Sequence, residues 1–388
     1  MGNKNLLIIA AIGLYLLSTG ISYSLFAKSS GTTAVAPVDT KKTNAYGALE
    51  FDNSGPKTEE CPLNGAMYTK QQRDWWQKHR PLGVMVENST DARPQSGLSF
   101  ADIVYESLAE GGITRFMGVF YCQDAGIVGP VRSARTYFLD WISEYGPNPL
   151  YAHVGGANTP GPADALGQIV DYGWNTYNDL NQFSIGFPTF KRDEGRLGHP
   201  VATEHTMYST TTGLWAIGAQ RDLTNVDKKG DAWDADFVKW SFKDDAASSN
   251  RPTSQKISMN FWEGNPAYDV VWTYNPTSNT YARTNGGTAH LDNNTKKQLS
   301  PKNVVILYEK ESRANDGYEN NLHELFKTIG SGTGVVFQDG KEIKVTWSKA
   351  DREARTVIKN VASGKEIEFN RGQIWIQVVP TYSDVTVS

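Results

Sequence analysis

The chain has 388 residues, which gives room for two domains and a linker. Its net charge of -4 excludes a bulk electrostatic attraction to nucleic acid, so no nucleic-acid partner is expected. Eleven tryptophans and eighteen tyrosines indicate well-packed, partly β structure, and a hydrophobic fraction of 39% fits globular domains joined to a polar segment.

The N-terminus predicts a membrane anchor. Residues 6–26 are apolar apart from scattered serines and threonines, and Lys4 and Lys28 flank them. About 20 such residues span a bilayer, so residues 1–27 are expected to form an uncleaved signal anchor with one transmembrane helix. The alternative is a signal peptide cleaved near Ser22-Tyr23-Ser24, although such peptides have a shorter apolar core. Because positive charge lies on both sides of the apolar run, it does not set the orientation.

Two folded regions are expected after the anchor. Residues 28–60 are rich in Thr, Ser, Gly, Pro, Asn and Lys, which is typical of a flexible tether. Residues 61–221 mix strand and helix patterns and predict an α/β domain. Residues 222–254 predict a polar linker with one strand, and residues 255–388 predict a β-rich domain, a small sandwich or barrel. The expected fold class is therefore α+β.

Strands and helices alternate in the first domain. Thr69 and Gln72 form a capping-box pattern at the start of a helix that Pro81 stops. A helix starting at Ser99 is an alternative to the first strand of the hairpin given next. The other expected elements are a strand at 82–86, a hairpin of 103–108 with 113–122, a helix over 132–145, a strand at 150–154, and helices over 159–172 and 209–219.

Cys61 and Cys122 are the two cysteines of the chain. An even, sparse count suggests one disulfide in an oxidising compartment, which favours a location of most of the chain outside the cytoplasm. The alternative is two separate, buried, reduced thiols, because spacing in the sequence cannot show proximity.

Four motifs follow one another in the first domain: RPQSGL over 93–98, ADIVYE over 101–106, EGGITRF over 110–116 and GPVRSAR over 129–135. Charged residues lie at the ends of apolar runs, which is how a site is built on a rigid sheet. These motifs, in this order, resemble the YerB-type envelope lipoproteins, a family of unknown function. The resemblance runs from about Arg80 to the C-terminus and implies an envelope location and a second β-rich domain, but no reaction. Lipoprotein members carry a Cys after the apolar run, whereas this chain has Ala27 and Lys28 there, so a transmembrane helix would replace the lipid.

The helix expected from Arg132 has an electrostatically unfavourable start. The N-terminus of a helix carries partial positive charge, to which Arg132 and Arg135 add. Free N–H groups, Ser133 and two guanidiniums would suit a phosphate or a carboxylate. The alternative is that an acidic residue of the ADIVYE or EGGITRF motif supplies the anion and forms an internal ion-pair network.

Further cationic side chains extend this predicted site. Arg93 and Arg115 lie near turn ends, and Arg192 lies in an irregular segment. His205 falls where the resembled family has an HNLY-like run, which implies a structural or site-lining role. The predicted ligand-binding residues are thus Arg93, Arg115, Arg132, Ser133, Arg135, Arg192 and His205.

The first functional hypothesis is a non-enzymatic protein of the cell envelope. One helix would hold it in the cell membrane, with most of the chain extracytoplasmic. It would bind a cell-wall polymer, a lipid-linked precursor or a wall-synthesis protein through the arginine-lined site, and it would need no cofactor. The motivating observation is a tether with two domains and without a G-x-S-x-G, P-loop or G-x-G-x-x-G motif.

The second hypothesis is a metal-dependent phosphotransferase or hydrolase acting on a lipid-pyrophosphate-linked wall precursor. The order of acidic residue, apolar hairpin and PVRSAR is faintly similar to the LytR-CpsA-Psr phosphotransferases, over part of the first domain and not in the motif itself. That resemblance implies that Arg115, Arg132 and Arg135 hold pyrophosphate and that Asp102 or Glu106 binds magnesium. The alternative for these two carboxylates is pairing with arginines.

Overall fold

The computed structural model describes residues 42–318 and 321–388. The signal anchor expected over 1–27 and the part of the expected tether up to residue 41 lie outside the described residues. Residues 42–60 of that tether are described, and the backbone N–H of Leu49 donates there to the carboxylate of Asp124 at 2.7 Å. Within the two described ranges, no helix is both long enough and apolar enough to cross a membrane.

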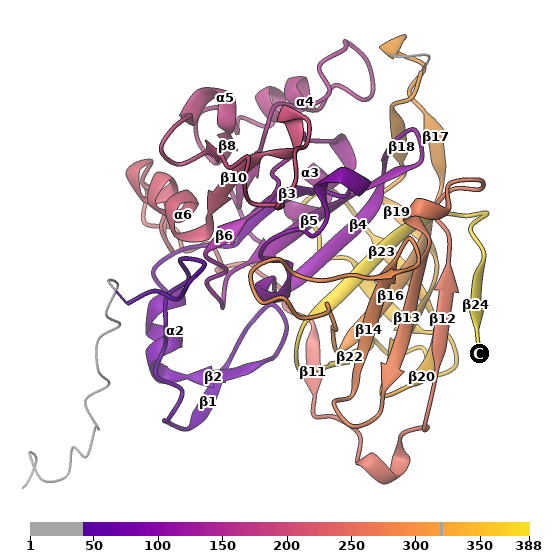
Figure 1. Cartoon of the computed structure of the whole chain (residues 1–388). Helices are drawn as coiled ribbons and strands as arrows, with labels where there is room; N and C mark the ends of the chain where they lie inside the picture. The colour runs from indigo at the N-terminus through magenta and orange to yellow at the C-terminus, as the bar shows by residue number, and fades with distance from the viewer. Residues whose placement is uncertain (1–41, 319–320) are drawn as a thin grey trace, which may run out of the picture. The chain divides into compact units, whose positions relative to one another are not determined.

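One mixed sheet of ten strands is the largest feature of the described chain (Figure 1). Its order is β21-β20-β19-β16-β23-β4-β5-β3-β7-β8. Five strands come from the C-terminal part of the chain: β21 (Val357–Asn360), β20 (Lys341–Lys349), β19 (Gly330–Gln338), β16 (Asn303–Glu309) and β23 (Ile374–Pro380). Five come from the N-terminal part: β4 (Ile103–Glu110), β5 (Ile113–Phe120), β3 (Leu82–Glu87), β7 (Leu150–His153) and β8 (Asp179–Asn181).

The two halves of this sheet meet where β23 pairs with β4. The pairing is parallel and places Ile374 beside Ile103 and Gln377 beside Glu106. The regions expected as separate domains therefore contribute strands to one sheet.

A second sheet of five antiparallel strands packs on one face of the large sheet. Its order is β15 (Thr288–Ala289), β14 (Thr280–Asn285), β13 (Val270–Asn275), β12 (Lys256–Met259) and β24 (Val385–Val387). Trp272 of β13 lies with its ring centroid 5.4 Å from that of Trp375 in β23, and its indole N–H donates to Gln377. The α+β prediction is confirmed. The sheet-on-sheet packing uses strands of both halves, whereas the sequence predicts a sandwich or barrel within residues 255–388 alone.

Short elements complete the described fold (Figure 1). The helices are α2 (Lys70–Trp76), α3 (Thr136–Ile142), α4 (Ala165–Asp171), α5 (Gln182–Ile185) and α6 (Thr211–Gln220). The small sheets pair β1 (Lys57–Glu60) with β2 (Met67–Thr69), β10 (Met207–Thr210) with β6 (Ile127–Val128) and β9 (Lys191–Arg192), β11 (Ser241–Lys243) with β22 (Glu368–Asn370), and β17 (Glu311–Arg313) with β18 (Glu324–Phe326).

Strand β4 is buried on both faces. Tyr105 stacks on Trp141 of α3, with ring centroids 5.4 Å apart, and the next residue, Glu106, reaches Arg283 of the five-stranded sheet. Successive side chains of a strand point to opposite faces, so α3 covers one face and the second sheet covers the other. This burial explains the long apolar runs that mark the central strands in the sequence.

Several local predictions are confirmed. The hydroxyl of Thr69 accepts the backbone N–H of Gln72 and caps α2. Strands β4 and β5 form the expected hairpin. Cys61 and Cys122 form the expected disulfide. The carboxylate of Asp102 lies close to their sulfur atoms, but both sulfurs are used in the disulfide, so the three residues are not a set of metal ligands.

The helix expected over 132–145 is shorter than predicted. It begins at Thr136, with Arg135 as the N-cap residue. Arg132 lies before the helix, and its backbone N–H donates to the carbonyl of Met85 in β3 at 3.0 Å. The prediction that Arg132 lies at a helix N-terminus is therefore wrong, because this segment hydrogen-bonds with the sheet instead.

Candidate functional site

Four strands of the large sheet end at one edge in polar or charged residues. β3 is parallel to β7 and β7 to β8, while β5 lies antiparallel between β3 and β4, so β3, β4, β7 and β8 run in one direction. Their last residues are Glu87, Glu110, His153 and Asn181. The carboxyl ends of parallel strands are the usual place for a ligand in open α/β sheets. We call this side of the sheet the carboxyl edge.

Glu110 binds two of the predicted arginines at this edge. Its carboxylate accepts hydrogen bonds from Nη2 of Arg115 at 2.8 Å and from Nε of Arg135 at 3.0 Å. Both arginine side chains are buried. Burial alone would raise the pKa of Glu110, but the charges of Arg115 and Arg135 outweigh it and lower the pKa to about 2. These three residues form an internal ion-pair network, the alternative that the sequence left open for them.

Arg132 and His205 meet at Glu87, the last residue of β3. Arg132 Nε lies 3.3 Å from Oε1 of Glu87, and His205 Nδ1 lies 2.9 Å from Oε2. Glu87 is buried, whereas the side chain of Arg132 is 27% exposed. Arg132 therefore presents part of its guanidinium to solvent.

Arg192 approaches the same place from β9. This strand pairs with β10, which begins two residues after His205. A backbone hydrogen bond lowers the pKa of the exposed Glu204 carboxyl, and the positive charges of Arg132 and Arg192 lower it further. Nη1 of Arg192 donates to the carbonyl of Thr203 and to the hydroxyl of Thr206, which flank His205. The structure thus brings Arg132, Arg192 and His205 together, and we call these three residues the arginine surface.

Arg93 and Ser133 have other surroundings. Nε of Arg93 donates to the side chain of Asn88 at 3.0 Å, and Nη1 donates to the carbonyl of Ala267 at 2.9 Å. Burial lowers the pKa of Arg93 to about 10. The carbonyl of Ser133 accepts a hydrogen bond from Arg115 at 3.0 Å. Arg93 thus contributes to the contact with the C-terminal half, and Ser133 contributes its backbone to the buried network.

Asp102 and Glu106, the candidate magnesium ligands, are fully buried. Asp102 accepts the backbone N–H groups of Tyr121 and Cys122 at 2.8 and 2.9 Å. Glu106 accepts two hydrogen bonds from Nη2 of Arg283, at 2.7 and 2.8 Å. A magnesium ion would have to displace these donors, so the two carboxylates do not fit the metal site that the enzyme hypothesis requires.

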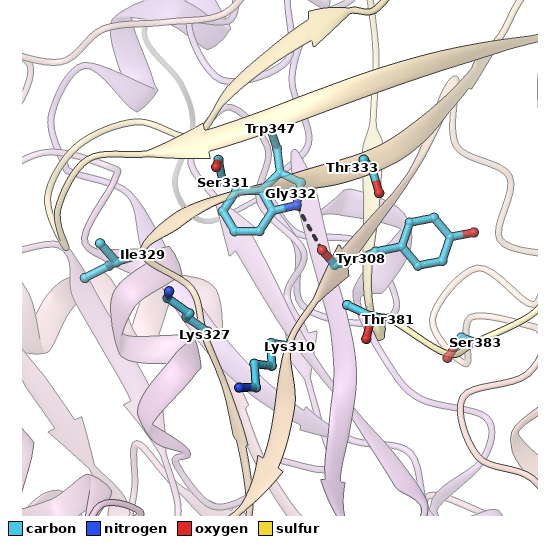
Figure 2. Close-up of a pocket in the computed structure, with 10 residues that line it drawn as sticks. All are labelled: Tyr308, Lys310, Lys327, Ile329, Ser331, Gly332, Thr333, Trp347, Thr381 and Ser383. Carbon is cyan, nitrogen blue, oxygen red and sulfur yellow. Dashed lines mark hydrogen bonds between the residues drawn. The ribbon is translucent and has the colours of Figure 1, made fainter.

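A cleft that the sequence analysis missed lies further along the carboxyl edge (Figure 2). β16 is parallel to β23 and β23 to β4, so these strands also end there. The cleft has a volume of about 510 Å³, and its lining includes Tyr308, Lys310, Lys327, Ser331, Thr333 and Ser383. Lys310 directly follows β16. In the first domain, charged residues at the ends of apolar runs were used to predict a site. The same pattern, Lys310 after the apolar run of β16, would have indicated this cleft.

Comparison with known proteins identifies the family. Residues 65–224 match the family described as "Protein of unknown function (DUF3048) N-terminal domain", and residues 257–376 match the corresponding C-terminal domain. The chain belongs to the DUF3048 family. The resemblance drawn from the four motifs is thereby confirmed.

A relative of this DUF3048 chain occurs in Bacillus subtilis. A protein of strain 168 named "Putative lipoprotein YerB" is 28% identical over 331 residues, which cover 85% of this chain and 88% of the relative. The crystal structure of the YerB protein from Bacillus subtilis has a TM-score of 0.66 and 24% identity, and the match covers 85% of this chain and 100% of that one. The solved structure therefore shares the fold.

The two DUF3048 domains of this chain share one sheet. β23, which the C-terminal match reaches, pairs with β4 of the N-terminal match. The carboxyl edge consequently takes side chains from both domains: Arg132 from the first and Lys310 from the second.

Proposed function

We propose that this chain is a membrane-anchored, extracytoplasmic protein of the cell envelope that binds an anionic ligand through Arg132, Arg192 and His205. Its DUF3048 domains and the name of its Bacillus relative support the location. The disulfide between Cys61 and Cys122 supports it as well, because disulfides persist in oxidising compartments.

The observation that carries the proposal is the balance of charge among the ionised side chains around Glu87 and Glu110, at the ends of β3 and β4. Four guanidiniums gather there, those of Arg115, Arg132, Arg135 and Arg192. Three carboxylates face them, those of Glu87, Glu110 and Glu204. Among these seven groups one positive charge is left over, before any proton on His205 is counted. The adjoining Arg196 and Asp193 carry opposite charges and leave this balance unchanged, so it favours an anion from solution.

The two less buried arginines keep donors for that anion. A guanidinium carries five N–H groups in a planar fork, which suits bidentate binding of phosphate or carboxylate. Arg132 approaches Glu87 through Nε, and Arg192 uses Nη1 for Thr203 and Thr206. Their other N–H groups form no hydrogen bond within the described residues. Arg115 and Arg135 are buried against Glu110 and would add positive charge behind the exposed arginines.

A phosphate-bearing wall polymer or a lipid-linked wall precursor has the chemistry that this surface recognises. The planar fork of a guanidinium matches the oxygen atoms of such a phosphate group. A phosphotransferase or hydrolase is not favoured, because Asp102 and Glu106 are buried and already occupied.

Isothermal titration calorimetry of the full-length chain with inorganic pyrophosphate, which measures the affinity for this anion, tests the proposal. Arg132→Ala and Arg192→Ala should each weaken binding about tenfold, through loss of a charge-assisted hydrogen bond. Arg371→Ala is the matched control, because Arg371 is also 27% exposed and also pairs with a glutamate, Glu60. Equal weakening in all three variants, or no binding of pyrophosphate, would contradict the proposal.

A further inference from the structure

The cleft at the ends of β16 and β23 carries two lysines, Lys310 and Lys327. The backbone N–H of Lys327 donates to the carbonyl of Lys310 at 3.0 Å, so the two residues lie side by side. Figure 2 shows both side chains on the same side of the cleft. Both residues are exposed and line the cavity.

Neither of these ammonium groups is neutralised by a carboxylate within residues 42–318 and 321–388. Lys243 and Lys349, in contrast, pair with Asp339 and Glu144. Two adjacent, unpaired positive charges at a cavity favour an anionic occupant. We call this cavity the lysine cleft.

Four hydroxyl groups also line the lysine cleft. They belong to Ser331, Thr333, Thr381 and Ser383. Ser383 is 8% exposed, and its Oγ has no hydrogen-bond partner among the described residues. A buried hydroxyl without a partner is unfavourable, so this oxygen is a polar atom beside the cleft whose hydrogen-bonding capacity is not used by the described residues.

We infer that the lysine cleft binds an anionic saccharide, a sugar that carries a phosphate or a carboxylate. Lys310 and Lys327 would hold the anionic group as point charges. The serine and threonine hydroxyls would exchange hydrogen bonds with the sugar hydroxyls, and the half-buried ring of Tyr308 would cover an apolar face of the sugar. A cavity of about 510 Å³ lies within the usual size of small-molecule sites.

This site is separate from the arginine surface. β3, which carries Glu87, and β16, which leads to Lys310, are four strand steps apart in the sheet. Neighbouring strands are spaced by about 4.8 Å, so roughly 19 Å separates the two places. One site can therefore be removed by substitution while the other remains.

Calorimetric titration of the full-length chain tests the inference. The anionic probes are N-acetylmuramic acid, which carries a carboxylate, and N-acetylglucosamine 1-phosphate; N-acetylglucosamine is the neutral match and inorganic phosphate is the anion without a sugar. At least one anionic sugar should bind about tenfold more tightly than both the neutral sugar and inorganic phosphate. Lys310→Met and Lys327→Met, which keep an unbranched side chain, should each weaken that binding about tenfold.

Two further variants, made in an Arg132→Ala background that removes anion binding at the arginine surface, make the result decisive. In that background Ser383→Ala should weaken binding several-fold, whereas Lys341→Met, at the opposite end of β20 from Trp347, should leave it unchanged. Unfolding temperatures of all variants confirm that each is folded. Binding that Lys341→Met weakens as much as Lys310→Met, equal affinity for inorganic phosphate and the anionic sugars, or no binding of either anionic sugar would overturn the inference.

Discussion

The carboxylate of Glu106 in β4 accepts two hydrogen bonds from Nη2 of Arg283 in β14, at 2.7 and 2.8 Å, and both side chains are fully buried. Trp375 and Gln377 of β23 also donate to Glu106, at 3.1 and 3.0 Å. A buried carboxylate is tolerated only when its oxygens are well satisfied, as they are here. Glu106 thus joins the N-terminal DUF3048 domain to both sheets of the C-terminal one.

Removing one partner of this pair should be costly. Arg283→Met leaves Glu106 buried without its charge partner, and the free energy of unfolding should fall by about 3–5 kcal/mol in urea titrations of the full-length chain. The double variant Glu106→Gln with Arg283→Met should be less destabilised, because no buried charge remains. Arg73→Met, which breaks a partly exposed pair with Glu59, should cost less than about 1 kcal/mol. A double variant less stable than Arg283→Met would refute this explanation.

Glu110 should make the protein sensitive to acid. Burial alone would raise its pKa, but Arg115 and Arg135 lower the pKa to about 2, against roughly 4.3 for an unfolded glutamate. Because the folded pKa is the lower one, the stabilisation is complete above pH ~4.3 and is lost as the pH falls towards 2. The stability gap between the wild type and Glu110→Gln should therefore be largest near neutral pH and shrink in acid. Urea titrations at a series of pH values measure it, and a gap that stays constant would count against the network.

Glu324 in β18 should have the opposite pH dependence. It is 1% exposed, neither carboxylate oxygen has a donor among the described residues, and burial together with the neighbouring Glu311 raises its pKa to about 8. Because the folded pKa is the higher one, stability is greatest below pH ~4.3 and falls as the pH rises towards 8. We therefore compare the unfolding temperature of Glu324→Gln with that of the wild type at each pH. The variant's advantage over the wild type should be larger at about pH 9 than at about pH 4. Glu342→Gln, exposed on β20, is the control, and the same response in both variants would refute the assignment.

Local signals in the sequence were sufficient for elements that depend on neighbouring residues. The cap at Thr69 and the turn at Gly111 and Gly112 involve residues close in the chain, and both were predicted. The pairing of β23 with β4 was not predicted, because short apolar runs fit many partners and nothing local marks Ile374 as the neighbour of Ile103.

The candidate site was predicted only in part for the same reason. The sequence indicated that charged residues lie at strand ends, and Glu87 and Glu110 do share one edge. It could not show that Arg132 and His205 both reach Glu87, because the segments that carry them are far apart in the chain. Arg132 was also misplaced on a helix, because the apolar spacing that follows it is helical whereas its own backbone bonds to β3.

Whether the arginine surface holds an anion can be measured most directly by NMR of the arginine Nε–H signals of the full-length chain during addition of pyrophosphate. The signals of Arg132 and Arg192 should shift together and saturate at one ligand concentration, while the signal of Arg371 stays in place. A shift of Arg371 that equals theirs, or unchanged signals of Arg132 and Arg192 at saturating pyrophosphate, would contradict the proposed site.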